Sequence, residues 1–354
     1  MVRKRPSGMK KCIIRLSGDP LPRGAGECKM KKILIIRFSS IGDIVLTTPV
    51  IRCLKHQVED AEIHYLTKKQ YLPILQANPY LHKIWLYEDH LRELIPQLKD
   101  QGFDFIVDLH KNHRSRFVKF KLGVPNVSFP KVNLQKWLMV NFKVDRLPRV
   151  HLVDRYFRAV DQLQIRNDHQ GLDYFIPEGE EFPLSELPVA FPRDFIAVAI
   201  GSRHATKMVP VELVIEIGRK INKPLILLGG KEDRERGDRI ATGLEPICYN
   251  ACGLISLNQS ASLVRQSERV LTNDTGLMHI AAAFRKPVVS VWGNTIPEFG
   301  MYPYFPTGHE NDSFIAEVRG LSCRPCSKLG FKKCPKKHFK CMTGLNVDEI
   351  VAHL

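Results

Sequence analysis

The sequence lacks a long run of apolar residues. Its longest stretch without a charged side chain, residues 246–264, is interrupted by amide and serine side chains, which are costly to place in hydrocarbon. The sequence therefore predicts no transmembrane helix. Its basic N-terminus has an apolar stretch only at residues 12–16, broken by Arg15. No signal peptide is expected, and the predicted compartment is the cytoplasm.

Three common catalytic signatures are also absent. The sequence contains no GxGxxG, no GxxxxGK[ST] and no GxSxG segment. Dinucleotide-dependent dehydrogenases and P-loop kinases need the first two spacings for their phosphate-binding turns, and serine hydrolases need the third for the nucleophile. Those three enzyme classes therefore lose their main support.

Acidic residues are in the minority, and the imbalance is local. The chain has 53 Lys and Arg against 37 Asp and Glu, a formal charge of +16, which by itself favours a nucleic-acid or membrane-surface partner. Residues 1–30 contain eight basic and two acidic side chains, and residues 319–341 contain eight basic and none acidic. The rest is nearly neutral, so we expect no nucleic-acid partner. The basic segment 319–341 is either a patch for an anionic ligand or a solvated loop.

Hydrophobic patterning indicates alternating strands and helices in the first half of the chain. A β-branched run at 31–40 predicts a buried strand, and apolar residues at helical spacing follow over 44–54. The alternation continues with strands near 62–66, 83–87 and 103–109, and with helices from 71 and over 91–99, 134–142 and 151–163. This order is typical of an α/β fold with a doubly wound parallel sheet.

A second alternating series follows a segment rich in Pro, Glu and Gly. Its expected strands are 195–202, 224–228, 247–249, 269–272 and 287–291, and its expected helices are 210–221, 232–244, 257–267 and 276–284. We therefore predict a disordered extension at 1–30, domains at 31–170 and 194–345, a linker at 171–193 and a C-terminal helix at 346–354. Two facing doubly wound domains place the carboxyl ends of their strands on opposite walls of one cleft.

The turn after the first strand contains a candidate catalytic carboxylate. Its sequence is Phe-Ser-Ser-Ile-Gly-Asp, and Asp43 comes directly before the predicted helix at 44–54. A carboxylate at a carboxyl strand end is well placed to act on a ligand in the cleft. Asp is equally a preferred helix N-cap, so catalysis and capping both remain open for Asp43.

A second turn, residues 273–279, is a candidate anion site. Its sequence is Asn-Asp-Thr-Gly-Leu-Met-His, and it follows a predicted strand and opens a predicted helix. Backbone N–H groups at a helix start favour a phosphate, Gly276 permits close approach, and Thr275 can donate a hydrogen bond. The alternative is that Asp274 caps the helix and His279 is a packing residue.

Further polar residues follow other predicted strands. Lys207 comes after the turn at Ser202, and Glu232 follows a Gly-Gly turn. A lysine near a phosphate site serves as a point charge, although a solvated loop lysine is the commoner case. One half of the chain thus offers a candidate base, and the other offers candidate anion-binding groups and a carboxylate suited to ribose hydroxyls.

Two segments carry a family resemblance. Residues 31–54, KILIIRFSSIGDIVLTTPVIRCLK, and residues 273–293, NDTGLMHIAAAFRKPVVSVWG, resemble the ADP-heptose:lipopolysaccharide heptosyltransferases of glycosyltransferase family 9. The resemblance covers about residues 31–354 and implies the GT-B fold, two Rossmann-like domains facing a cleft. Val209 stands where family members commonly have Trp, and the cysteine-containing segment 319–341 is a further departure, so the acceptor's identity is less well supported than the reaction.

The resemblance implies roles for individual residues. Asp43 matches the family's proposed general base. The donor-binding positions that match are Ser202, Lys207, Glu232, Asp274, Thr275, Gly276 and His279. The implied reaction is inverting transfer of heptose from an ADP-sugar donor to a lipopolysaccharide core or lipid A acceptor, without a catalytic metal. The implied location is the cytoplasm, with peripheral contact to the inner membrane.

Other functions remain as alternatives. The enzyme could use another nucleotide sugar or acceptor, or act as a GT-B sugar-nucleotide epimerase that needs no acceptor. A basic zinc-ribbon protein that binds nucleic acid is a different class, disfavoured because aromatic residues are sparse among its cations.

Four cysteines in the basic segment are candidate metal ligands. Cys323 and Cys326 form a CxxC pair, and Cys334 and Cys341 follow singly. A structural zinc site fits a cytoplasmic protein, and His338 offers a substitute ligand. The second cysteine pair is wider than the usual zinc knuckle, so redox-active thiols and disulfides are the alternatives.

Overall fold

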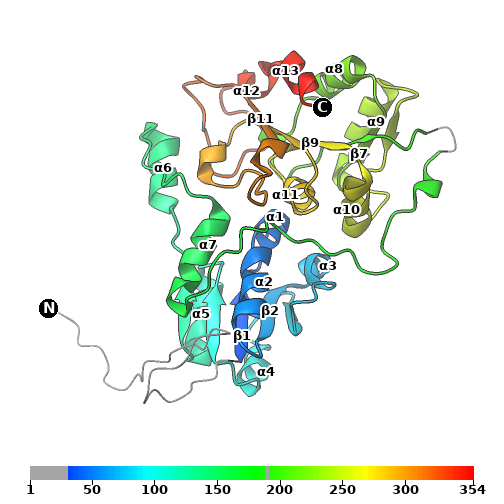
Figure 1. The fold of residues 1–354 in the computed structure, drawn as a ribbon. Helices are drawn as coiled ribbons and strands as arrows, with labels where there is room; N and C mark the ends of the chain where they lie inside the picture. Colours follow the sequence, from blue (N-terminus) through cyan, green and yellow to red (C-terminus); the bar gives the residue numbers. More distant parts are fainter. Residues whose placement is uncertain (1–30, 189–190) are drawn as a thin grey trace.

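The computed structural model describes residues 31–188 and 191–354 and contains two parallel β-sheets (Figure 1). The predicted extension at 1–30 lies outside the described residues. The first sheet has the order β3-β2-β1-β4-β5. Its strands are β1 (Lys32–Ile36), β2 (Glu62–Lys68), β3 (Lys83–Tyr87), β4 (Phe105–Asp108) and β5 (Asn126–Ser128). We call this sheet and its helices the N-terminal lobe.

The side chains of β1 alternate between two helical layers. Ile33 and Ile35 belong to one apolar cluster, together with residues of α2 (Thr48–Gln57) and α7 (Leu152–Val160). Leu34 and Ile36 belong to another, together with residues of α4 (Ile95–Asp100) and α5 (His113–Leu122). Successive residues of a strand face opposite sides of a sheet, so both faces are covered. The remaining helices here are α1 (Ile41–Val45), α3 (Leu72–Leu75) and α6 (Asn133–Phe142), with 3-10 turns η1 (Lys69–Tyr71) and η2 (Asp161–Leu163).

The second sheet has the order β11-β10-β9-β6-β7-β8 and defines the C-terminal lobe. Its strands are β6 (Ile196–Ala199), β7 (Leu225–Leu228), β8 (Cys248–Asn250), β9 (Arg269–Asn273), β10 (Val288–Trp292) and β11 (Ser313–Glu317). Its helices are α8 (Val211–Ile221), α9 (Arg234–Thr242), α10 (Leu257–Gln266), α11 (Gly276–Ala283), α12 (Lys340–Thr343) and α13 (Val347–Ala352). The short 3-10 turns are η3 (Leu184–Glu186), η4 (Ala205–Lys207), η5 (Lys231–Asp233), η6 (Pro297–Phe299) and η7 (Glu310–Asp312). The prediction of two doubly wound parallel sheets is confirmed.

The segment between the sheets is packed against the protein. Leu172, Tyr174, Phe182 and Leu187 are buried in the same apolar cluster as residues of both lobes. Tyr174 Oη also donates to Asn258 Oδ1 of α10, at 2.6 Å. These contacts hold the segment along both lobes, so it is no freely extended linker.

Several elements differ from the sequence predictions. The structure contains α5 and β5, and also β11, which the hydrophobic pattern did not indicate. The single helix predicted at 44–54 is divided into α1 and α2. The first helix ends before Leu46 and the second begins after Thr47, with Pro49 in its first turn. A proline is favourable in the first turn of a helix and unfavourable inside one.

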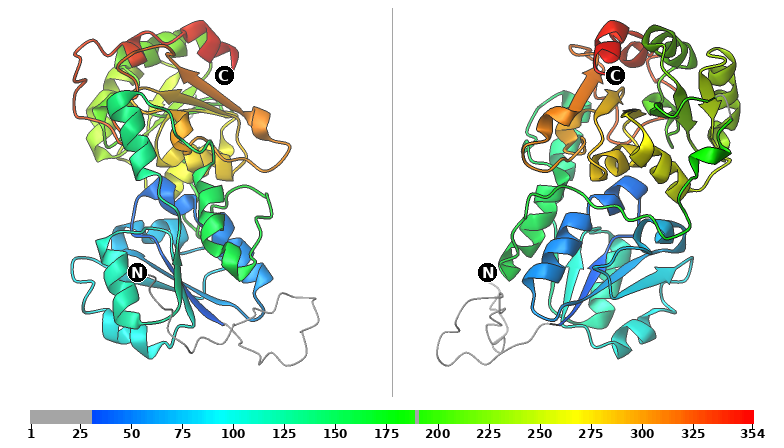
Figure 2. Two further views of the ribbon diagram at one scale, coloured as in Figure 1. Left: turned by 90° about the vertical axis from the view of Figure 1, so that its left-hand side faces the viewer. Right: turned by 45° about the vertical axis from the view of Figure 1, so that its right-hand side comes forward.

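Helix α6 lies beside the C-terminal lobe although it belongs to the first half of the chain. Figures 1 and 2 show it standing along the flank of that lobe in each view. Met139 and Val140 of α6 pack against a small cluster formed by Leu147, Ile296 and Phe299. Helix α6 therefore bridges the two lobes.

Candidate functional site

Asp43 lies inside helix α1, near its start. The N-cap is Ser40, and Asp43 is the third helical residue. The N–H and the hydroxyl of Ser40 both donate to Asp43 Oδ2, at 3.1 Å and 2.8 Å. The alternative that Asp43 itself caps a helix beginning at residue 44 is therefore wrong, because the helix begins at Ile41. Asp43 instead completes a capping box, which fixes its carboxylate.

Arg37, at the end of β1, fixes the other oxygen of the same carboxylate. Arg37 Nη2 lies 2.6 Å from Asp43 Oδ1. The guanidinium also donates to the carbonyl oxygens of Ser39, at 2.7 Å, and Leu109, at 2.6 Å. Burial alone would raise the pKa of Asp43, but the charge of Arg37 and the hydrogen bonds from Ser40 leave this pKa below its usual range. Asp43 is therefore an ionised carboxylate with a fixed orientation.

Asp274 lies at the end of β9, beside a lysine from another loop. Lys207 Nζ in η4 lies 2.5 Å from Asp274 Oδ2, and the hydroxyl of Thr295 donates to the same oxygen at 2.9 Å. The N-cap of α11 is Thr275, so the alternative that Asp274 caps this helix is wrong. Its carboxylate pairs with Lys207 instead.

His279 is buried in the first part of α11. Burial lowers its pKa to about 4, so the ring is neutral near pH 7. Its Nδ1 has no hydrogen-bond partner among the described residues. His279 is thus neither a cation for a phosphate nor a packing histidine with both nitrogens satisfied.

Two glycines bring the lobes together at this point. A Cβ on Gly42 of α1 would lie 2.5 Å from His279 Cδ2, and a Cβ on Gly276 of α11 would lie 2.6 Å from Ile41 Cγ2. Only glycine at these positions lets the starts of α1 and α11 approach so closely. This contact places Asp43 and Asp274 near enough for both charges to act on the pKa of His279. The structure thus brings together Asp43, Lys207, Asp274, Thr275, Gly276 and His279.

Ser202 and Glu232 lie on neighbouring turns of the C-terminal lobe. Ser202 follows β6, and its hydroxyl lies 3.5 Å from the N–H of His204. Glu232 is in η5 and exposed, whereas the next residue, Asp233, is buried. Asp233 Oδ2 accepts a hydrogen bond from the N–H of Gly230 at 2.9 Å. Asp233 therefore stabilises the turn and leaves the carboxylate of Glu232 accessible.

Lys136, which no local sequence pattern indicated, reaches the same region from α6. Its ammonium lies over the ring of Phe299, 4.9 Å from the centroid, and has no ion-pair partner among residues 31–188 and 191–354. Burial lowers its pKa to about 8, with Arg155 acting in the same sense and Asp43 and Asp274 opposing. The helical spacing of apolar residues over 134–142 predicts the helix, but it does not predict the contact of Lys136 with the distant Phe299.

The basic segment 319–341, called the insert below, supports the donor-side residues through hydrogen bonds. Arg324 donates to the carbonyl oxygens of Gly293, at 2.7 Å, and Thr295, at 3.0 Å, and Thr295 contacts Asp274. Thr206, next to Lys207, exchanges backbone and hydroxyl hydrogen bonds with Phe331. The insert therefore contacts the turn that contains Lys207 and the loop whose Thr295 contacts Asp274.

The cysteines of the insert form no disulfide among the described residues. Cys323, Cys326, Cys334 and Cys341 are free thiols, and Cys323 Sγ lies 3.8 Å from His338 Nε2. The charges of Cys323 and Cys334 act on the pKa of Cys326, which burial raises. These residues therefore lie in one neighbourhood, although their ligand atoms are not gathered within 4.8 Å.

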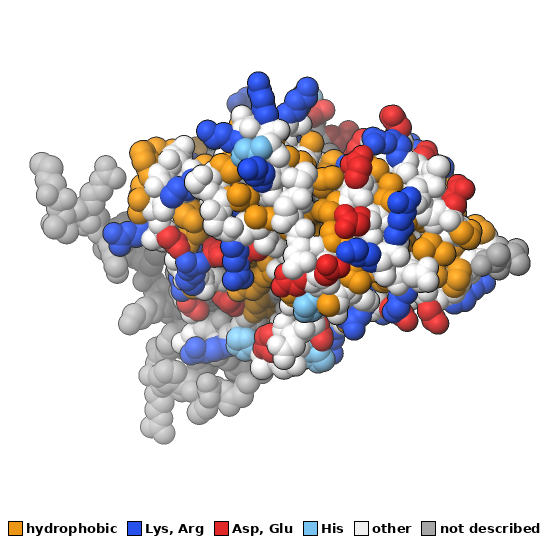
Figure 3. Space-filling view, turned by 90° about the horizontal axis from the view of Figure 1, so that it is seen from above, with side chains coloured by type: hydrophobic (Ala, Val, Ile, Leu, Met, Phe, Trp, Pro, Cys, Tyr) orange, Lys and Arg blue, Asp and Glu red, His pale blue; other side chains and the backbone are white. Residues whose placement is uncertain are grey.

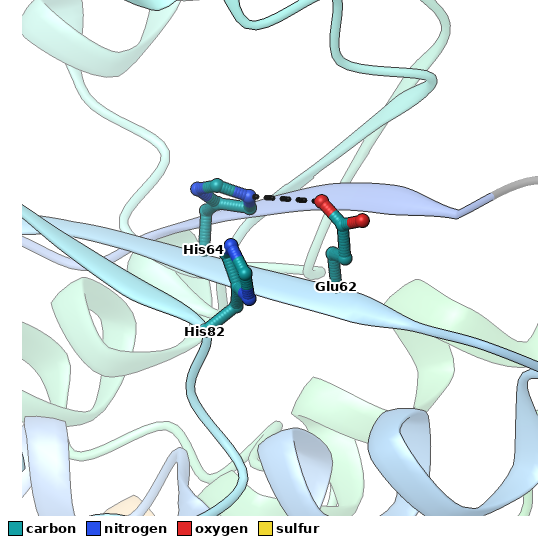
Figure 4. Close-up of side chains that lie close together, drawn as sticks. All are labelled: Glu62, His64 and His82. Carbon is teal, nitrogen blue, oxygen red and sulfur yellow. Dashed lines mark ion pairs between the residues drawn. The ribbon is translucent and has the colours of Figure 1, made fainter.

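Within the described part of the chain, one group of possible metal ligands has its ligand atoms within 4.8 Å of one another: Glu62, His64 and His82 (Figure 4). Trp85 Nε1 donates to His64 Nδ1 at 3.1 Å, and an indole N–H is only a donor. The neutral His64 ring therefore has its proton on Nε2, the atom that faces Glu62 at 3.9 Å. This nitrogen has no lone pair for a metal. The group also starts at the amino end of β2, whereas Asp43 follows the carboxyl end of β1.

The chain is also similar in sequence to known proteins. A family profile described as glycosyltransferase family 9 (heptosyltransferase) matches residues 91–328. Lipopolysaccharide heptosyltransferase 2 of Escherichia coli K12 is 24% identical over 293 residues, which cover 76% of this chain and 84% of the relative.

Two solved structures show the same fold. The glycosyl transferase family 9 structure from Veillonella parvula has a TM-score of 0.67 at 22% identity and covers 81% of this chain and 86% of that chain. The structure of E. coli ADP-heptose lps heptosyltransferase II has a TM-score of 0.66 at 21% identity and covers 91% of this chain and 98% of that chain. The predicted GT-B fold is confirmed.

Proposed function

This chain belongs to glycosyltransferase family 9, and on that premise we propose that it transfers a heptose from ADP-heptose to a hydroxyl of the lipopolysaccharide inner core. The names of its relatives support both substrates. The observation that carries the proposal is the contact of α1 and α11 at Gly42 and Gly276. The carboxylate of Asp43 in one lobe therefore lies close to the start of α11 in the other, which is the proposed anion site.

Asp43 is the proposed general base. A carboxylate oxygen of Asp43 takes the proton from the acceptor hydroxyl while the hydroxyl oxygen attacks the anomeric carbon of the heptose. The bond between that carbon and the ADP phosphate oxygen breaks, and the configuration at the carbon inverts. General bases contribute about 10²- to 10⁴-fold to a rate. Because Arg37 and Ser40 hold Asp43, the carboxylate need not reorient during the reaction.

The leaving ADP is the proposed ligand of the donor-side residues. Negative charge develops on its diphosphate, where Lys207 and the N–H groups that open α11 at Thr275 and Gly276 would act. Lys207 is paired with Asp274, so we infer that it exchanges part of this pairing for the diphosphate. Ser202 is assigned to the phosphate side and Glu232 to the ribose hydroxyls, and His279 would contact the ligand as a neutral ring.

The test is turnover of purified protein with ADP-heptose and an inner-core acceptor that lacks the heptose. We expect ADP release together with a mass increase of one heptose on the acceptor, without added metal. ADP-heptose consumption at the same rate without acceptor would indicate an epimerase or hydrolase instead. Transfer from a different ADP-sugar at equal kcat/KM would contradict the assignment of the donor.

We also propose that Cys323, Cys326, Cys334 and Cys341 hold one structural metal ion, with zinc as the expected metal and His338 as a substitute ligand. Four thiolates form a donor set that zinc favours, and binding would require the four sulfurs to move together. The ion would brace the insert without contacting the reactants.

Elemental analysis of protein purified without added zinc tests this proposal. About one metal per chain is expected, reduced in Cys334→Ser and unchanged in the control Cys53→Ser, whose cysteine lies in α2. Metal-free protein whose thermal stability is unaffected by chelator would overturn the proposal.

The acceptor implies a location for the protein. Because the acceptor lipid is anchored in a membrane, we propose that the enzyme works in the cytoplasm as a peripheral protein at the inner membrane.

A further inference from the structure

Helix α6 presents an apolar face that no other part of the described chain covers. None of its residues is buried. Leu134, Trp137, Leu138 and Asn141 have the spacing of one helical face, and Leu134 is 64% exposed. Phe142 is 60% exposed and contacts the Trp137 ring, with centroids 5.1 Å apart. Two large aromatic side chains and a leucine thus face outward together.

The opposite face of α6 is already occupied. Met139 and Val140 pack on the cluster containing Ile296 and Phe299, and Lys136 lies over Phe299. These contacts fix the rotation of the helix about its own axis. The helix therefore cannot rotate to bury its outward face against the same cluster, and the exposure of that face requires another explanation.

The insert lies against the C-terminal end of α6. Lys143 Nζ donates to the carbonyl oxygens of Pro325, at 2.6 Å, and Cys323, at 3.5 Å. Further along the insert, Leu329 is 66% exposed and Phe331 is exposed as well. We use the name flank surface for the exposed residues Leu134, Trp137, Phe142 and Val144 together with Leu329 and Phe331. These are six of the eight large exposed hydrophobic residues among those described.

The two segments that carry the flank surface have an excess of basic side chains. Residues 131–149 contain five basic side chains and one acidic residue, Asp145, which pairs with Arg149. The insert adds eight basic residues and no acidic ones, among them the exposed Lys332, Lys333, Lys336 and Lys337. Figure 3, which views the molecule from above, shows Lys and Arg side chains projecting from the edge of this face, with hydrophobic groups and some Asp and Glu side chains between them.

We propose that the flank surface docks on an anionic phospholipid bilayer. Apolar and aromatic side chains at helical spacing insert into the headgroup region of a bilayer, and surrounding cations bind anionic headgroups. No described helix is long and apolar enough to cross a bilayer, so this contact is peripheral. A nucleic acid would use the cations but not the exposed Leu134, and a second copy of the chain would bring an equal excess of positive charge.

Docking by this surface would also serve the reaction. The same helix carries Lys136, whose pKa responds to Asp43 and Asp274, so the bilayer would lie next to the site. This consequence rests on the proposed function, since it assumes an acceptor anchored in the bilayer. Binding to vesicles without acceptor does not depend on that assumption.

Cosedimentation with vesicles of phosphatidylethanolamine and phosphatidylglycerol measures the docking directly. The apolar variant replaces Leu134, Trp137 and Phe142 by Ser, and its control replaces Phe120 and Leu254, two exposed hydrophobic residues on other elements, by Ser. We expect the partition coefficient to fall about tenfold or more in the apolar variant and to stay unchanged in the control. Lys332→Ser with Lys333→Ser should weaken binding at low salt, whereas Lys99→Ser with Lys121→Ser should not.

Further readouts decide the proposal. Thermal unfolding and ADP binding of the apolar variant should match the wild type, which shows that it folds. Equal vesicle binding by the apolar variant and its control would overturn the proposal, as would binding to RNA with no vesicle binding. A dimer in solution that the apolar variant abolishes, without any vesicle binding, would assign the surface to a second copy.

Transfer rates then separate docking from the proposed function. Heptose transfer to acceptor embedded in vesicles should fall in the apolar variant, while transfer to the deacylated, soluble acceptor should not. If neither protein transfers heptose but vesicle binding still depends on Trp137 and its neighbours, the function assigned above fails and the docking surface remains.

Discussion

Arg37 Nη2 and Asp43 Oδ1 lie 2.6 Å apart at the end of the first strand. Helix capping and catalysis therefore do not exclude each other at Asp43, because its two carboxylate oxygens have different partners. Oδ2 of Asp43 serves the capping box with Ser40, while Oδ1 is held by the guanidinium. A carboxylate held at both oxygens has a defined direction, which is what a general base needs to meet a hydroxyl.

The first prediction separates the two roles of Asp43. Asp43→Asn keeps the size of the side chain but removes its ability to accept a proton, so kcat should fall about 10²- to 10⁴-fold, while ADP affinity changes little. The control is Ser40→Ala, which removes the cap and should cost about 1 kcal/mol of unfolding free energy with much of the activity retained. Steady-state kinetics and urea unfolding measure both. Activity of the Asp43→Asn variant within a few-fold of wild type would show that Asp43 serves only the helix.

The second prediction concerns the pH dependence of transfer. The base must be ionised, so kcat/KM falls as the pH decreases through the pKa of Asp43. In the wild type this pKa lies below its usual range, so Asp43 imposes no acidic limb between pH 6 and 8. In Arg37→Met the raising effect of burial is no longer opposed by that charge, and the limb should move to higher pH. Arg116→Met, on the exposed side of α5, is the matched control, and the same profile in both variants would contradict the argument.

The third prediction concerns stability in acid. Burial lowers the pKa of His64 and His279 to about 4, and that of His151 to about 3, against about 6.5 in an unfolded chain. Between pH 6.5 and 4 the unfolded chain binds these protons and the folded chain does not. The free energy of unfolding should therefore decrease as the pH falls, by up to about 1.4 kcal/mol per pH unit for each group.

Carboxylates with lowered pKa values add to the same trend at lower pH, so a variant is needed to isolate the histidines. Urea unfolding at pH 7.5, 6 and 5 should show a shallower pH dependence for His64→Gln than for wild type. His56→Gln, in which an exposed histidine is replaced, should keep the wild-type slope. If the free energy of unfolding depends on pH in the same way in all three proteins, His64 has the same pKa in the folded and unfolded chain and the prediction is wrong.

How far the sequence predicts this structure depends on whether the deciding contacts are local. The strand at 83–87 is confirmed at both ends, because aliphatic and aromatic residues alternate there. Helix α5 was not predicted, since Lys and Arg surround its few apolar residues. The helix was predicted to begin at residue 44, whereas α1 begins at Ile41. Ile41 and Gly42 contact α11 and do not continue the apolar spacing from which the helix was predicted.

The candidate site follows the same division. Asp43, Asp274 and Lys207 stand at carboxyl strand ends, which topology brings to one edge of each sheet. Their roles in the reaction stay predictions. No sequence pattern indicated Arg37, Lys136 or Arg324. Lys136 and Arg324 act through contacts with distant loops, and the fold places Arg37 against both Asp43 and the distant Leu109. A sequence pattern identifies groups at strand ends, whereas the residues that orient them appear only in three dimensions.

The last prediction tests whether the insert positions the donor site. Arg324 is 7% exposed and paired with Glu317, and it donates to the carbonyl oxygen of Thr295, whose hydroxyl donates to Asp274. Arg324→Gln should lower the free energy of unfolding by roughly 1.5 kcal/mol, because a buried hydrogen bond from a charged group is lost. It should also weaken ADP binding, because Thr295 and Asp274 lose this support. Arg319→Gln is the control, since Arg319 pairs with the same carboxylate but is 84% exposed. Calorimetry with ADP should separate the two variants, with KM for the donor raised more than kcat is lowered in Arg324→Gln. Equal ADP affinity in both variants would mean that Thr295 and Asp274 keep their places without Arg324.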